Sequence, residues 1–387
     1  MGHADATVVV EMGFMPATHA IPDPDHPGLL RAGPRASGPY GGESVEVRVC
    51  EATDCAQDES VTPNLFDCGF DTADLSGLDE LQAVCRRIRA SGRIDDADAA
   101  AVRAALDGAD LRLAGGSTVT VLHLADEGLI MRKAGPNRLS VVGPRSSGMN
   151  DHGAATSVHA DQDVFGTPLS QIMDGRAPSL FRHESPDGHN RDAGLMLVNM
   201  WIPLQQITQP LVLGDGRSVD RRRHQLRYGL ATQSFLERED DLAINDIWTF
   251  LHDGGQRWYL RSQMDHRSAY VFDTLSTPHG SCILPGEDVA QQWYLAAEAA
   301  EAAVEAGDVA ALAGALSASL PDRVPSSAPP ALAEAVARIV AVIDEARTDP
   351  ATVCSEGAGE WLARSREARQ PLVRMSLELR MVVSVAS

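Results

Sequence analysis

Short segments in which apolar and polar residues alternate dominate the middle of the chain. In residues 44–50, Val45, Val47 and Val49 point to one side and Glu46 and Arg48 to the other, as in a half-buried strand. Similar strand-like runs, separated by turn residues, occur at 119–123, 139–142, 195–201, 209–213, 256–260 and 268–272. Many short strands at this spacing predict an all-β sandwich or barrel.

Helical periodicity appears in two other regions. Residues 77–107 predict two helices, the first with apolar residues at helical spacing between Leu78 and Ile88, the second beginning in the acidic run at Asp95. The Ala-rich, acidic region 288–370 predicts helices at 288–306, 308–319 and 329–347, with a last helical turn near Trp361. Residues 372–386 then return to a strand, so we expect a helical region inserted between two strands of one sheet.

The chain therefore divides into three predicted regions. Residues 1–43, rich in Pro and Gly, predict an irregular N-terminal arm. Residues 44–287 together with 371–387 predict a mainly β core supported by the N-terminal helices. Residues 288–370 predict a helical insertion, which could cover a site, form an interface or redirect substrate choice. The sequence predicts no oligomeric state.

The C-terminal strand has two different faces. Its apolar residues alternate with four polar ones, Arg374, Ser376, Glu378 and Arg380. In a barrel with an internal site, the polar face would point inward and the apolar face would pack outward on helices. A guanidinium beside a hydroxyl, as in Arg374 and Ser376, suits a carboxylate ligand. A solvated edge strand with its polar residues in water fits the alternation equally well.

Composition narrows the function classes. The 387 residues contain 33 Lys+Arg and 54 Asp+Glu, a net charge of −21, and Lys133 is the only lysine. Such an acidic surface repels phosphate backbones, so we expect no nucleic-acid partner. Lys133 does not lie in a Gly-Lys-Ser/Thr phosphate loop, which argues against a P-loop enzyme. A pyridoxal enzyme would have to form its Schiff base on this one lysine.

Nothing in the sequence predicts a membrane or secreted location. No window of about 18 apolar residues is free of charge, and the first residues lack the basic and apolar parts of a signal peptide. The six cysteines include no Cys-x-x-Cys pair, which disfavours a zinc ribbon or dithiol site. We expect a cytoplasmic protein with no membrane partner and with buried or idle thiols.

One short motif has the chemistry of a metal site. In His159-Ala160-Asp161 the imidazole and carboxylate lie two residues apart, so on an extended chain both point to one face and can bind one ion. A distant histidine would complete a two-His, one-carboxylate triad, which leaves three positions open on iron(II). The pair alone is not specific, because His3-Ala4-Asp5 repeats it.

Downstream residues give the motif its context. With Thr277-Pro278-His279 and then Arg374-x-Ser376, the sequence resembles the iron(II)/2-oxoglutarate-dependent oxygenases. More narrowly, it is similar to the family of the cephamycin C-7 hydroxylase component, fungal gibberellin desaturase and meroterpenoid oxygenases. The matching stretches are 158–162, 198–204, 210–219, 256–259, 272–274 with 278–279, and 374–380. They follow one another over roughly 155–285 and 371–383, with weaker similarity from 45 to 140.

The resemblance implies a double-stranded β-helix (jelly-roll, cupin-like) core with an N-terminal α/β extension. It implies that His159, Asp161 and His279 bind iron(II), and that Arg374, assisted by Ser376, binds the distal carboxylate of 2-oxoglutarate. The chain departs from the family at Ile202, where the family usually has arginine. Arg374 also follows the last ligand by 95 positions (374 − 279), where the family has a short link.

The implied function is an oxygenase of specialised (natural-product) metabolism that uses O₂ and 2-oxoglutarate on a small organic substrate. Hydroxylation is the expected reaction, and desaturation, cyclisation and endoperoxide formation are variants of the same chemistry. His183, Trp201 and Trp258 are candidates for substrate contact. Alternatively, His183 is an exposed loop histidine and the two tryptophans belong to the core. A non-catalytic jelly-roll binding or partner subunit stays open. A metallohydrolase would not explain why Arg374 and Ser376 share a face.

Overall fold

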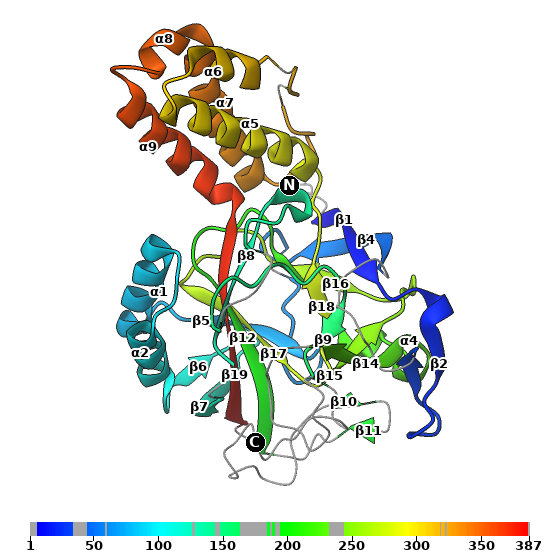
Figure 1. Ribbon diagram of the computed structural model, residues 1–387. Coiled ribbons are helices and arrows are strands. Elements are labelled where there is room, and N and C mark those ends of the chain that lie inside the picture. Colours follow the sequence, from blue (N-terminus) through cyan, green and yellow to red (C-terminus); the bar gives the residue numbers. More distant parts are fainter. Residues whose placement is uncertain are drawn as a thin grey trace.

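The computed structural model describes residues 6–33, 45–58, 60–125, 128–143, 148–162, 184–185, 188–189, 194–231, 244–317, 319–321 and 323–385. Most of these residues form two β-sheets with helices around them (Figure 1). Apolar side chains from both sheets, including Phe70 and Phe272 from one and Leu211 and Leu213 from the other, form one buried cluster. The two sheets therefore lie against each other, an arrangement compatible with a jelly-roll.

The larger sheet has ten strands. In spatial order they are β1 (Thr7–Phe14), β4 (Glu46–Asp54), β16 (Trp258–Leu260), β13 (Leu211–Gly214), β18 (His279–Ser281), β9 (His159–Ala160), β15 (Ile244–Phe250), β14 (Gln225–Ala231), β3 (Leu30–Ala32) and β2 (Ala20–Pro22). One face of this sheet is covered by an apolar cluster that includes Phe14, Val158 and Trp258.

The second sheet has seven strands. They are β5 (Phe70–Asp74), β17 (Ser268–Asp273), β12 (Leu195–Pro203), β19 (Arg374–Val385), β7 (Thr118–Leu124) and β6 (Asp110–Arg112), with β8 (Ile130–Ala134) also paired to β19. A separate hairpin consists of β10 (Glu184–Ser185) and β11 (Gly188–His189). Short helical turns are η1 (Ala17–His19), η2 (Pro136–Arg138), η3 (Gly216–Ser218), α4 (Arg221–His224) and η4 (Gln370–Leu372).

Helices α1 (Asp79–Ser91) and α2 (Asp96–Leu106) cover the outer face of the seven-stranded sheet (Figure 1). Their apolar sides join Met375, Leu377, Leu379 and Met381 of β19 in the largest buried cluster. The polar residues of β19 point the other way, and those nearest its start are also buried, with Arg374 2% and Ser376 0% exposed. The prediction that the polar face of this strand points inward is confirmed, and the solvated edge strand is excluded.

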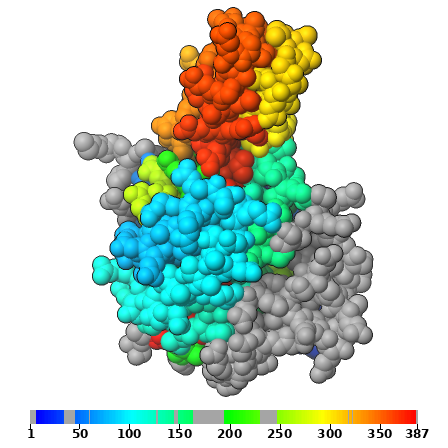
Figure 2. Space-filling view, turned by 60° about the vertical axis from the view of Figure 1, so that its left-hand side comes forward, coloured from blue at the N-terminus to red at the C-terminus, as the bar shows by residue number. Residues whose placement is uncertain are grey.

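The predicted helical region forms a bundle of α5 (Glu287–Glu305), α6 (Val309–Ala315), α7 (Pro330–Thr348), α8 (Pro350–Val353) and α9 (Ala358–Arg369). Figure 2 shows this bundle projecting from the rest of the molecule. It has its own apolar cluster around Trp293 and Trp361. Inside it, Glu301 accepts hydrogen bonds from Ser365 (2.8 Å) and Arg369 (2.8 Å). None of the described helices is both long and apolar enough to cross a membrane.

Two expectations about local structure were wrong. The region 1–43 is not an irregular arm throughout, because residues 7–14 pair along their whole length with β4 and bury Val10, Met12 and Phe14. Residues 139–142 form no strand. They follow a turn in which Asn137 and Arg138 adopt positive φ, and Leu139 and Val141 pack on the helical bundle instead. The last helical turn expected near Trp361 is part of the helix α9.

Candidate metal centre

Two neighbouring strands of the ten-stranded sheet bring the predicted metal ligands together. His159 on β9 and His279 on β18 are directly opposite each other in register, and their ring centroids are 4.4 Å apart. Asp161 follows β9, and its Oδ1 lies 3.5 Å from Nε2 of His159 and 3.6 Å from Nε2 of His279. All three side chains are buried, and their ligand atoms lie within 4.8 Å of one another. No other such group of three occurs in the described ranges.

The backbone fixes the orientation and tautomer of both imidazoles. Nδ1 of His159 lies 2.8 Å from the carbonyl oxygen of Ser157, and Nδ1 of His279 lies 3.0 Å from that of Thr277. A carbonyl oxygen only accepts, so each Nδ1 carries the proton and donates it. Each Nε2 is left with a lone pair directed toward the other ligands, the arrangement that metal-binding histidines need. In both cases the acceptor is two residues before the histidine.

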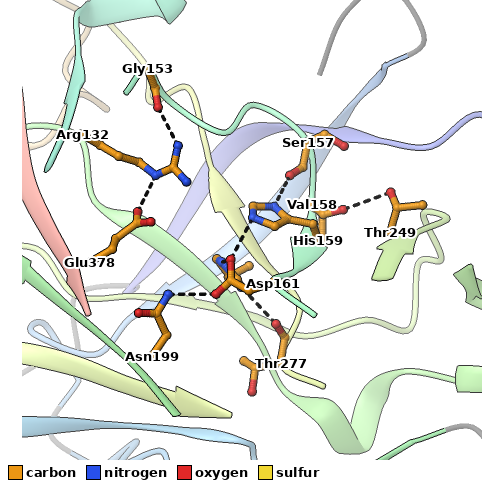
Figure 3. Close-up of polar contacts among 11 residues, drawn as sticks. Arg132, Gly153, Ser157, Val158, His159, Asp161, Asn199, Thr249, Thr277 and Glu378 are labelled. Atoms are coloured by element: carbon orange, nitrogen blue, oxygen red, sulfur yellow. Dashed lines mark hydrogen bonds and ion pairs between the residues drawn. The ribbon is translucent and has the colours of Figure 1, made fainter. Parts of the chain in front are cut away.

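The third ligand is held from the opposite sheet. Nδ2 of Asn199, on β12, donates a 2.8 Å hydrogen bond to Oδ2 of Asp161 (Figure 3). This contact occupies one carboxylate oxygen and leaves Oδ1 facing the two imidazoles. Asn199 is 3% exposed, so the bond is shielded from water and positions the carboxylate strongly.

The protonation states also suit a cation. Burial opposes ionisation of Asp161, yet the two histidines hold the pKa of its carboxyl well below the usual range. Burial, together with the neighbouring His279, lowers the pKa of His159. Burial also acts against a charged His279, but the Asp161 carboxylate outweighs it and raises the pKa of that imidazole. A metal ion binding here would therefore compete with a proton shared by His279 and Asp161.

A buried guanidinium, that of Arg374, lies near His279. Arg374, on β19 of the seven-stranded sheet, reaches across and donates from Nη2 to Oγ of Ser281 (2.9 Å), two residues beyond His279. It also donates from Nη1 to the carbonyl oxygen of Gln209 (3.3 Å) and lies 5.8 Å from the ring centroid of Trp201. Nε of Arg374 and Oγ of Ser376 are buried without a hydrogen-bond partner in the described structure. Buried polar atoms of this kind are usually satisfied by a ligand or water.

The same inward face of β19 carries an ion pair. Glu378 accepts a 2.7 Å hydrogen bond from Nε of Arg132, which comes from the neighbouring strand β8. Nη1 of Arg132 donates to the carbonyl oxygen of Gly153 (3.0 Å). Figure 3 places this pair beside His159 and Asp161.

The predicted substrate-contact residues lie in different places. Trp201 points between the sheets, near Arg374 and in the same cluster as Phe272, whose ring centroid is 4.5 Å from that of His279. Trp258 belongs to the cluster on the other face of the ten-stranded sheet. The register pairs its neighbour Tyr259 with Leu213, which in turn pairs with His279. Trp258 is therefore turned away from the histidines. His183 lies outside the described residues.

Position 202 also lies outside the site. Ile202 belongs to the cluster between the seven-stranded sheet and the helices α1 and α2, whereas Asn199 and Trp201 point to the opposite face of β12. The absence of the family's arginine at this position therefore removes no group from the metal centre.

Sequence reasoning missed three residues of the site, and two of them carried a signal. Asn199 is the one polar residue in the apolar run 195–203, and Ser281 shares the face of His279 by the two-residue period of a strand. Arg132 lies in a strand that the sequence pattern did not predict, so its position depended on β8 pairing with β19.

Comparisons with known proteins add little to this geometry. No family model and no curated protein matches the chain. Among solved structures, the iron and alpha-ketoglutarate-dependent endoperoxidase NvfI aligns over 99% of this chain and 100% of its own, with a TM-score of 0.47 and 13% identity. The same enzyme in a different conformation gives 0.48 and 12%, with the same coverage. At these values the likeness supports no assignment of function, so function has to be inferred from the geometry of the site.

Proposed function

We propose that this chain is a non-haem iron(II)- and 2-oxoglutarate-dependent oxygenase with a jelly-roll core, acting on a small organic substrate of specialised metabolism. One observation supports this most strongly. A buried two-His, one-Asp group on one sheet faces a buried arginine from the other, and Ser281, which that arginine contacts, is two residues from His279. A metal triad next to a carboxylate-binding guanidinium is what a chelating dicarboxylic oxo acid requires.

The donor set fits iron(II). Two neutral imidazole nitrogens and one carboxylate oxygen are typical ligands of non-haem iron sites that keep positions open. His159, Asp161 and His279 would hold the ion, and Asn199 would fix the carboxylate. The same donors would also accept zinc, so the metal ligands alone do not distinguish an oxygenase from a hydrolase.

Arg374 makes the distinction. Its unpaired Nε and the unpaired hydroxyl of Ser376 are buried on one face, and a carboxylate bound there would satisfy both. Ser281 already holds the guanidinium in place. These residues would bind the distal carboxylate of 2-oxoglutarate, whereas a hydrolase has no use for a buried carboxylate-binding arginine at this position.

When bound, iron(II) with O₂ and 2-oxoglutarate supplies the oxidising power to attack an unactivated C–H bond. The protein contributes orientation and exclusion of water. Trp201, Phe272 and the other apolar residues between the sheets shield the space next to His279. We propose hydroxylation as the outcome. Desaturation, cyclisation and endoperoxide formation use the same ligands and differ in how the substrate is placed.

The test is anaerobic reconstitution with iron(II) and 2-oxoglutarate. We expect the weak visible charge-transfer absorption of the chelated complex in the parent protein, and its loss in both His159→Ala and Arg374→Ala. His152→Ala is a matched control, because this imidazole bonds to the carbonyl oxygen of Gly148 and not to the triad. No absorption in the parent, or its survival in both site variants, would contradict the proposal.

A further inference from the structure

The ion pair between Arg132 and Glu378 has no role in the proposed function. Neither residue is a metal ligand, and in the described part of the chain neither forms a hydrogen bond with Arg374 or Ser281. The pair nevertheless lies on the inward face that also carries Arg374 and Ser376. Arg132 is in register with Ser376 across β8 and β19, and Glu378 is two residues further along. Figure 3 shows the guanidinium and the carboxylate beside His159 and Asp161.

The bonds of Arg132 leave part of its guanidinium available. Nε is bonded to Glu378 and Nη1 to the carbonyl oxygen of Gly153. Among the described residues, no group accepts a hydrogen bond from Nη2. The side chains of Arg132 and Glu378 are 21% and 13% exposed, so this pair is partly open, unlike the fully buried Trp201 nearby. An arginine held at two nitrogens, whose third has no acceptor among the described residues, is positioned to bind a ligand there.

The fold does not need an ion pair at this position. Pairing charges in a protein interior costs desolvation, and apolar residues of similar size often serve as well or better. The same space between the sheets is in fact filled by apolar residues on the side of Trp201 and Phe272. The ion pair is therefore kept beside the metal triad although the fold could do without it, which favours a role in binding.

The carboxylate of Glu378 is shared among several cations. It interacts electrostatically with Arg132, Arg374 and Arg380, all of which lie along the inward side of β19 and its neighbour β8. With the proposed ligands bound, Arg374 would be matched by the distal carboxylate of 2-oxoglutarate. Arg132 would still have only this shared carboxylate as its bonded acid. A second anionic group bound to Nη2 of Arg132 would complete the neutralisation of the Arg132 guanidinium.

We propose that Arg132 forms a subsite for a carboxylate of the substrate, with Glu378 as its partner when no substrate is bound. The substrate class is thus a carboxylic acid whose acid group lies beside the triad while the carbon to be oxidised faces the metal. This proposal rests on the proposed function for its placement of metal and 2-oxoglutarate. The incoming carboxylate would accept a hydrogen bond from Nη2 and would displace one of the present bonds of Arg132. Glu378 competes with this carboxylate for the guanidinium.

The test uses trifluoroacetate as the probe, observed by fluorine NMR, because it is small enough to bind without the rest of a substrate. The full-length protein would be loaded with zinc and saturating 2-oxoglutarate, so that Arg374 is occupied. Trifluoroacetamide serves as the uncharged analogue. The variants are Arg132→Gln, Arg132→Lys and Glu378→Gln, with thermal unfolding measured for each.

The two substitutions should act in opposite directions. Removing the charge of Glu378 frees the guanidinium, so Glu378→Gln should tighten trifluoroacetate binding several-fold. Arg132→Gln should weaken it by at least tenfold, and Arg132→Lys, which keeps the charge but loses the fork, should lie in between. The uncharged analogue should bind to none of them. A purely structural ion pair would instead give losses of stability in both variants and no such divergence in binding.

Three results would overturn the inference. One is trifluoroacetate binding in Arg132→Gln equal to the parent. Another is an equal loss in Glu378→Gln and Arg132→Gln. The third is a loss of 2-oxoglutarate affinity in Arg132→Gln as large as the loss of trifluoroacetate affinity, which would assign Arg132 to the oxo acid. Failure of the proposed function would appear separately, as a parent protein that binds no 2-oxoglutarate in its own titration.

Discussion

The hydrogen bond from Asn199 to Asp161 gives a quantitative test of how the two sheets cooperate. In Asn199→Ala, Oδ2 of Asp161 loses the donor that lies 2.8 Å away in the other sheet. The carboxylate stays buried but gains freedom to rotate out of the position in which Oδ1 faces both imidazoles. We expect weaker metal binding with an otherwise intact fold.

The size of the effect can be worked from the chemistry of this bond. A hydrogen bond to a charged group contributes about 1.5–3 kcal/mol when both partners are buried. A change of about 1.4 kcal/mol is tenfold in an equilibrium constant, so metal affinity should fall by roughly 10- to 100-fold. The same range is typical when a residue that orients a metal ligand is removed.

The assay is competition for zinc or iron(II) with a chromophoric chelator, combined with urea unfolding. Asn150→Ala is the matched control, because Asn150 is also a buried asparagine but bonds only to the backbone of Ile94. It should lose stability and keep metal affinity. Metal binding in Asn199→Ala within twofold of the parent, or an equal loss in Asn150→Ala, would refute the reasoning.

Three further predictions concern stability and the support of the site. Glu301→Ala leaves the buried hydroxyl of Ser365 without its acceptor and Arg369 with only the exposed Glu298 as a partner, so it should cost about 2–3 kcal/mol in urea unfolding. Glu345→Ala, in an exposed pair, should cost under about 1 kcal/mol; equal costs would contradict this. Burial raises the pKa of Glu287 from 4.5 to about 7, so the folded state holds a proton that the unfolded chain releases. The free energy of unfolding should then fall, by on the order of 3 kcal/mol, as pH rises from about 4.5 to 7, and Glu287→Gln should lack this slope in a pH series of melts. Gly69 has φ +94°, and a Cβ there would lie 2.6 Å from Oγ1 of Thr277. Because the carbonyl oxygen of Thr277 orients His279, Gly69→Ala should reduce both stability and metal affinity. Unchanged zinc affinity would argue against a link between Gly69 and the orientation of His279.

The sequence predicted the elements whose pattern is local and strong. Both N-terminal helices, the bundle and the strands containing Val121, Val198 and Leu377 were recognisable, because each repeats its period over several residues. The short strands were harder. The strand β8 has five residues and β3 has three, and such segments are strands because a partner is present and not because of their own composition. Residues 139–142 show the reverse case, since an apolar run found its partner in the helical bundle.

The site was predictable to the same degree. His159, Asp161 and the inward row of β19 follow from a two-residue period, and their meeting with His279 followed from the resemblance. Positions that depend on the pairing of sheets were not predictable. Trp258 could not be placed on the outer face without knowing that its neighbour Tyr259 is in register with Leu213. Arg132 could not be linked to Glu378 without the pairing of β8 with β19.

The distance of 95 positions from His279 to Arg374 does not weaken the placement of the arginine. The helical bundle begins at Glu287 and the last helical turn ends at Leu372, next to β18 and β19 respectively. Because the bundle folds around its own apolar cluster, it returns the chain to the same region at an entropic cost far below that of an open loop of this length. The register of β19 is then set by its pairs with β12 on one side and β7 and β8 on the other. A slip of one residue would turn Arg374 outward and bury Leu377 among the charges, so strand pairing, and not the length of the connection, holds Arg374 in position.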